Sequence, residues 1–131
     1  LRTGTIVVRK GAGTVVSDGV ASWTCRRSCS ALATGGTGDV LSGLLGGLVA
    51  RLTPRHRPEL AALPQAVRMK MPQDASRPLD YFDAACLAVD IHAACAQLWM
   101  TRSSASGGML ASEITDEIPG ELERRTAQES R

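Results

Sequence analysis

The sequence predicts an α/β fold in which a short antiparallel sheet precedes three to four helices. The first 24 residues hold three short runs rich in β-branched residues. The runs at 40–52 and 82–100 instead repeat apolar residues at helical spacing. The chain has 131 residues, of which 44% are hydrophobic and 21% charged, and it is therefore expected to form one domain with its own core.

The sheet is predicted from the chain before residue 25. Thr5–Val8 is a β-branched run, which is typical of a strand buried on both faces. Asp18–Gly19 separates the runs 14–16 and 20–24, and Asp-Gly between β-prone segments favours a hairpin. Three strands in so short a stretch predict the edge of a sheet.

The first helix is expected to follow the glycine-rich loop at 34–39. Its core-facing stripe consists of Val40, Leu41, Leu44, Leu45, Leu48 and Leu52. Gly43, Gly46 and Gly47 lie in the same helix, where each costs about 1 kcal/mol relative to alanine. Such glycines are tolerable in a helix if another backbone or a ligand must approach closely.

Two further helices are predicted. The Ala-rich run 82–100 has a core stripe at Phe82, Cys86, Val89, Ala93 and Ala96. A last helix begins near Ser112, and we expect an interruption at Pro119 and fraying of the charged end from Glu121 to Arg131. Residues 54–78 hold five of the six prolines and are interpreted as a mobile surface insertion.

The charge balance excludes some partners. The chain contains 15 Lys and Arg and 13 Asp and Glu. The resulting net charge of +2 does not favour binding to nucleic acid or to an anionic membrane. Only four aromatic residues are available for base stacking. No apolar run reaches the roughly 20 residues of a membrane helix, so no span is predicted.

The four cysteines are interpreted as free intracellular thiols, because the chain opens on Leu1–Thr3 without a recognisable leader. A cytoplasmic location is expected, with a mitochondrial one left open. A zinc set of Cys25, Cys29, His92 and Cys95 is disfavoured because the paired-cysteine spacings of structural zinc sites are absent, and no metal site is predicted. The missing initiator Met leads us to expect residues upstream.

The segment Gly35–Asp39 stands where a loop becomes a helix. Free amides and the helix dipole at such a point favour an anion, and glycine lets the anion come close. A carboxylate would repel a phosphate, so Asp39 is either a helix cap or a general base for a hydroxyl that attacks a phosphoryl group. The segment is neither a P-loop nor a dinucleotide fingerprint, because no lysine follows Gly38 and Leu41 replaces the third glycine.

A second candidate is the segment Lys10–Thr14 at the end of the first strand. Lys10 is one of two lysines in the chain, and open α/β sheets bind ligands at the carboxyl ends of strands. The alternative is an ordinary exposed cation at a turn.

Together, Val8–Val16 and Leu32–Gly43 resemble the C-terminal half of the ADP/ATP-dependent NAD(P)H-hydrate dehydratases, whose ribokinase-like fold is a three-layer sandwich. Gly108–Ile114 and Ile118–Pro119 resemble the last helix of that family. The resemblance covers nearly all of 1–131 except 54–78. It implies the C-terminal part of such a domain, with the N-terminal half absent.

The resemblance implies a lyase that uses ADP or ATP, with Mg²⁺, to remove water from hydrated NADH or NADPH. The nucleotide-binding residues that it implies are Lys10, Gly11, Ala12, Gly13, Thr14, Thr34, Gly35, Gly36, Thr37 and Gly38. Asp39 would bind the hydrated nicotinamide and act as catalytic base on its hydroxyl. Phosphorylation of that hydroxyl, followed by loss of phosphate, would convert a poor leaving group into a good one. Cys25, Ser28 and Cys29 depart from the Asn and Gly-Asn residues that many members carry there.

Two other functions stay open. A small-molecule kinase of the same superfold would phosphorylate a sugar or vitamin hydroxyl with the same chemistry. A truncated nucleotide-binding module would bind without catalysis. His92 is interpreted as a packed or capping histidine. The choice between ADP and ATP is left open, as is a homo-oligomer.

Overall fold

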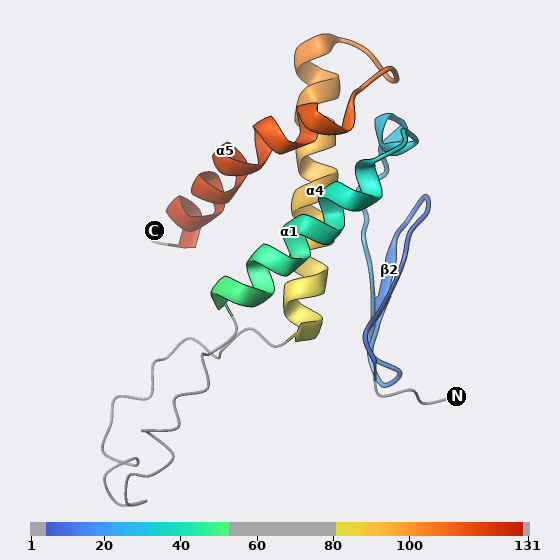
Figure 1. The fold of residues 1–131 in the computed structure, drawn as a ribbon, viewed down its shortest axis with the longest axis vertical. Coiled ribbons are helices and arrows are strands. Elements are labelled where there is room, and N and C mark those ends of the chain that lie inside the picture. Colours follow the sequence, from blue (N-terminus) through green and yellow to red (C-terminus); the bar gives the residue numbers. More distant parts are fainter. Residues whose placement is uncertain (1–4, 53–80, 130–131) are drawn as a thin grey trace, which may run out of the picture.

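The computed structural model describes residues 5–52 and 81–129. In chain order, the elements are β1 (Val7–Arg9), β2 (Val15–Ser17), β3 (Ser22–Thr24), the 3-10 turn η1 (Ser30–Leu32), α1 (Thr37–Leu52), α4 (Tyr81–Ser103) and α5 (Ala111–Glu129). Figure 1 shows α1 and α5 crossing the long helix α4, with the small sheet beside them. The predicted α/β class, hairpin and helices are therefore confirmed, whereas the segment interpreted as an insertion, 54–78, lies outside the described residues.

The sheet is antiparallel, with strand order β1-β2-β3. Val8 pairs with Val16, and Val16 pairs with Trp23 on the other side. Val16 is fully buried, and its two partners pack against the same core. The other face is open among the described residues, because Val7 is 54% exposed. The expected burial of the first strand on both faces is thus wrong, since β1 is an edge strand covered on one side.

The centre of the core is α4. Its buried residues are Ala84, Ala85, Ala88, Val89, Ile91, His92, Ala93, Ala94, Cys95, Ala96 and Trp99. Small alanine side chains on several faces let α1, α5 and β2 all pack closely against this helix. Within the described residues, α4 alone is long and apolar enough for a membrane span, but 61% of its most apolar window is buried inside the fold. The length and composition of α4 would allow a membrane span, but its burial inside the fold is typical of the core helix of a globular domain.

The glycines of α1 do not mark a close approach by any described segment. An ideal Cβ at Gly43, Gly46 or Gly47 would meet no atom within 4 Å among the described residues. The three positions lie on the exposed side of the helix. No described backbone approaches these glycines, and the core is contacted by the opposite face through Leu41 and Leu48. Approach by a ligand or by a segment outside the described residues stays a prediction.

The last helix runs without interruption through Pro119 to Glu129, so the predicted break is wrong. Pro119 and Thr115 are both exposed, and water can therefore satisfy the carbonyl left without a partner. The start of α5 is capped reciprocally, since Glu113 Oε2 accepts the Leu110 amide and the Glu113 amide donates to the Leu110 carbonyl.

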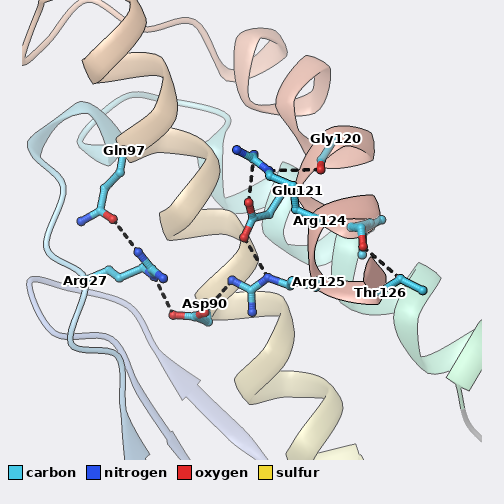
Figure 2. Close-up of polar contacts among 9 residues, drawn as sticks. Arg27, Asp90, Gln97, Gly120, Glu121, Arg124, Arg125 and Thr126 are labelled. Carbon is cyan, nitrogen blue, oxygen red and sulfur yellow. Dashed lines mark hydrogen bonds and ion pairs between the residues drawn. The ribbon is translucent and has the colours of Figure 1, made fainter. Parts of the chain in front are cut away.

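The charged end of α5 is helical through Glu129, which differs from the fraying expected from Glu121 onward; residues 130–131 of that prediction lie outside the described residues. Glu121 is buried, and Arg125 bridges it to Asp90 of α4 at 2.8 and 2.7 Å (Figure 2). These ion pairs join the end of α5 to the central helix.

Candidate functional site

A cavity of about 510 Å³ lies where the turn after β1 meets the segment 25–33 and the middle of α4. Apolar side chains of α1 and α4 form one wall, with Leu41, Val89 and Ala93. Its polar lining residues include Lys10 and Thr14. A cavity of this size with an apolar wall and a few polar groups is typical of a small-molecule site.

The turn 10–14 has a defined shape that comes from its own residues. The Thr14 hydroxyl donates to the Gly11 carbonyl at 3.2 Å and lies 3.4 Å from the Gly11 amide. Gly13 adopts a φ of +76°, which glycine tolerates and other residues rarely adopt. The Cys25 amide donates to the Thr14 carbonyl at 2.8 Å, so the turn is joined to the segment that forms another cavity wall.

The Gly-rich loop is anchored through Thr37, the first residue of α1. Thr37 is 2% exposed, and its hydroxyl lies 3.0 Å from each of the carbonyl oxygens of Leu32 and Thr34. The ammonium of Lys10 lies 3.5 Å from the same hydroxyl oxygen. The loop is therefore fixed to the body of the domain immediately before Gly38.

Lys10 lies directly against the backbone of Gly38. An ideal Cβ at that position would be 3.3 Å from Lys10 Nζ, which is tighter than most real Cβ contacts. Glycine therefore leaves room for a cation at the start of α1. The amides of Asp39 and Val40 both donate to the Gly36 carbonyl. Within residues 5–52 and 81–129, the amides of Gly35, Gly36 and Gly38 have no acceptor, as an anion-binding loop requires.

His92 connects α4 to the end of the Gly-rich loop at Thr37. It is 3% exposed, and its Nε2 lies 2.8 Å from the Thr37 carbonyl oxygen. A carbonyl only accepts, so Nε2 carries the proton. Burial lowers the pKa of His92; the bond to Thr37 opposes this and the charge of Lys10 adds to it. The histidine is thus neutral near pH 7 and serves as a hydrogen-bond donor.

The structure brings together part of the predicted site. Lys10, Gly11, Ala12 and Thr14 line the large cavity, and Gly13 shapes their turn. Gly38 lines an adjoining cavity of about 120 Å³, which shares Lys10, Leu41 and Val89 with the first. Thr34, Gly35 and Gly36 line neither cavity, and Thr37 is buried beneath them.

Asp39 lies apart from both cavities. It is in the first turn of α1, its side chain is exposed, and it lines neither space. No described residue hydrogen-bonds to its carboxylate, so the alternative of a helix cap finds no bond to support it. Among the described residues, the carboxylate is exposed.

Further polar side chains line the cavity. Cys25, Ser28 and Cys29 were noted in the sequence as departures from the residues of the family, and His92 was interpreted as a packed or capping histidine. Arg27 also lines the cavity, and no sequence signal had identified it. The cysteines form no disulfide in the described regions. The same regions contain no group of three His, Cys, Asp or Glu residues that could hold a metal.

Comparison with known proteins agrees with this architecture. The family model for NAD(P)H-hydrate dehydratase matches residues 2–120. Over 118 residues, the chain is 34% identical to the ADP-dependent (S)-NAD(P)H-hydrate dehydratase of Bacillus subtilis, which covers 88% of this chain and 32% of the relative. It is 35% identical over 113 residues to the bifunctional NAD(P)H-hydrate repair enzyme Nnr of Vibrio cholerae, with coverages of 86% and 17%.

A solved structure gives the same result. The ADP/ATP-dependent NAD(P)H-hydrate dehydratase from Bacillus subtilis, co-crystallised with ATP/Mg²⁺, matches with a TM-score of 0.66 at 29% identity. The match covers 92% of this chain and 34% of the solved chain. The fold is that of the ribokinase-like dehydratases. The chain belongs to the NAD(P)H-hydrate dehydratase family, and it spans about a third or less of the length of these relatives.

Proposed function

We propose that the chain forms the nucleotide-binding part of an enzyme that uses ADP or ATP to dehydrate hydrated NADH or NADPH. The observation that carries this proposal is the position of Lys10. Its ammonium lies against Gly38, beside unpaired amides at the start of α1, and it also lines the large cavity. An ammonium beside free amides is suited to the phosphates of a nucleotide.

The size and the apolar lining of the large cavity support a nucleotide as its ligand. About 510 Å³ is within the range of small-molecule sites, and Leu41, Val89 and Ala93 offer an apolar surface to a nucleoside. Mg²⁺ is expected to accompany the nucleotide phosphates. No described residue is assigned to it, because the described regions offer no metal-binding cluster and Mg²⁺ is often bound mainly through substrate phosphates and water.

Asp39 is proposed as the catalytic base. Its exposed carboxylate follows directly after Gly38, so a hydroxyl that attacks a phosphate held by the loop can reach it. The hydroxyl proton of the hydrate goes to Asp39 while the hydroxyl oxygen bonds to the terminal phosphorus of the nucleotide. The bond from that phosphorus to the bridging oxygen breaks, and AMP leaves from ADP, or ADP from ATP. Loss of phosphate with its C–O bond electrons, and of a ring proton, then restores the dihydronicotinamide.

The test compares Asp39→Asn with Asp116→Asn, an exposed carboxylate on α5, in the same chain. We expect Asp39→Asn to abolish dehydration, measured as recovery of the reduced cofactor, and to leave ADP affinity within about twofold, because the role of a base is in proton transfer. Asp116→Asn keeps both properties. Normal turnover by Asp39→Asn would eliminate the assignment of the base.

A non-catalytic binding module is the second candidate, because Asp39 lines neither of the two cavities beside the Gly-rich loop. Nucleotide binding without recovery of reduced cofactor would support it. Accumulation of a stable phosphate ester from a sugar or vitamin would instead indicate a kinase. We further propose a cytoplasmic location, which the free thiols of the described regions support.

A further inference from the structure

Arg27 is the second cation of the large cavity. Among the described residues that line it, Lys10 and Arg27 are the permanent positive charges, and no Asp or Glu is present. Arg27 also lines a neighbouring polar cavity of about 180 Å³ with Gln97 and Thr101. Its side chain is 42% exposed, so the guanidinium is accessible to a ligand.

Two residues of α4 hold this guanidinium in place. Arg27 Nε donates to Asp90 Oδ1 at 2.9 Å, and Nη1 donates to Gln97 Oε1 at 2.8 Å (Figure 2). In the described parts of the chain, Nη2 has no partner. One edge of the guanidinium is therefore oriented by the protein, while hydrogen-bond donors remain for a ligand.

The ion pair of Arg27 is shared with a second arginine. Asp90 accepts from Arg27 through Oδ1 at 2.9 Å and from Arg125 through Oδ2 at 2.7 Å. Arg125 and Arg124 also pair with Glu121, at 2.8 and 2.9 Å. Asp90 is therefore not reserved for Arg27, which contacts it through Nε alone.

We propose that Arg27 is a second anion-binding residue of this cavity, which contacts phosphate oxygens of the bound nucleoside phosphate and is oriented by Asp90 and Gln97. The proposal rests on the proposed function for the identity of the ligand. Arginine suits this role because its planar, permanently charged fork matches phosphate geometry. Lys10 and Arg27 would then contact the anion from the turn after β1 and from the segment after β3.

The test compares Arg27→Gln with Arg26→Gln, the neighbouring exposed arginine, which lines none of the three cavities described above. Calorimetry measures binding of ADP, adenosine and inorganic tripolyphosphate. We expect Arg27→Gln to weaken ADP and tripolyphosphate about tenfold and adenosine by less than about twofold, because a charge-assisted hydrogen bond is lost. Arg26→Gln should keep all three affinities. Thermal unfolding of both variants checks that they fold.

The orienting role is tested with Gln97→Leu, which removes the acceptor of Nη1 without changing charge. We expect ADP affinity to fall about threefold, as for the loss of one neutral hydrogen bond. In the double variant with Arg27→Gln, the Gln97→Leu change should have no further effect. Equal losses from Gln97→Leu with and without Arg27 would overturn the orienting role.

The other outcomes separate the role of Arg27 from the proposed nucleotide function. Normal ADP affinity in Arg27→Gln would overturn the role of Arg27 and leave the proposed function intact. An equal loss of adenosine and ADP would overturn the assignment to phosphate. Arg27-dependent binding of tripolyphosphate by a chain that does not bind ADP would keep Arg27 as an anion-binding residue and overturn the nucleotide function. A wild-type chain that binds none of the three would overturn both.

Discussion

At the scale of single residues, the site depends on the contacts of Gly38 and Thr37. Gly38 leaves space for the Lys10 ammonium, and Thr37 fixes the loop through its hydroxyl and its carbonyl. The sequence predicted Lys10 and Gly38 because a strand end and a helix start are local features. Arg27 and His92 could not be assigned in this way, since their partners are 63 and 55 residues away in the sequence.

His92 gives a prediction about pH. Burial keeps its pKa in the folded state below the ordinary value, so the unfolded chain takes up the proton first as the pH falls. The free energy of unfolding should therefore be constant above about pH 7 and decrease as the pH drops below the ordinary value of about 6.5.

Urea unfolding between about pH 7.5 and pH 5 measures this dependence. The matched variant is His92→Asn, which does not titrate and keeps an amide donor. We expect this variant to show a flatter pH profile in the window where the unfolded histidine titrates. The same decrease in both proteins would show that His92 is not its source.

At the scale of elements, local patterns predict where strands and helices form but not how their ends are held. Asp18–Gly19 predicted the hairpin correctly, since Asp18 Oδ1 accepts the amides of Val20 and Ala21 within the turn itself. The same reasoning failed for α5. Its charged end was expected to fray, but Arg125 joins it to Asp90 on another helix, and this tertiary contact leaves no periodic signal.

The end of α5 provides the prediction at this scale. Arg125→Gln removes the ion pair to Asp90 of α4 and a pair to Glu121 within α5, whereas Arg124→Gln removes only a pair to Glu121 within α5. We expect faster amide hydrogen exchange over 121–129 in Arg125→Gln, and a much smaller change in Arg124→Gln, since exposed pairs at helical spacing contribute only about 0.3–0.5 kcal/mol. Equal exchange in the two variants would contradict the role of Asp90 as an anchor.

The acidity of Asp90 supports this anchor across the neutral pH range. Burial acts to raise its pKa, but hydrogen bonds from Arg125 and Arg27 and the charges of both hold the pKa below its ordinary value. Asp90 therefore stays ionised near pH 7, and its contribution to stability is lost only as the pH falls through the acid range where the carboxyl group protonates.

At the scale of the whole molecule, α4 is the common support of the core and of the site. Several of its faces pack against α1, α5 and β2, and its residues Val89, His92 and Ala93 line the cavity. The sequence could predict this helix and its stripe, because alanine and apolar residues recur at helical spacing. It could not predict that the same helix presents Asp90, His92 and Gln97 to the loop and turn residues around the cavity.

A structure of the chain with bound ADP would show which residues hold the nucleotide. We expect phosphate oxygens within hydrogen-bond distance, about 3 Å, of Lys10 Nζ and of the Gly38 amide. We also expect the nucleoside against the apolar wall of Leu41, Val89 and Ala93. A nucleotide bound elsewhere, or phosphates that contact neither Lys10 nor the Gly-rich loop, would contradict the proposed function.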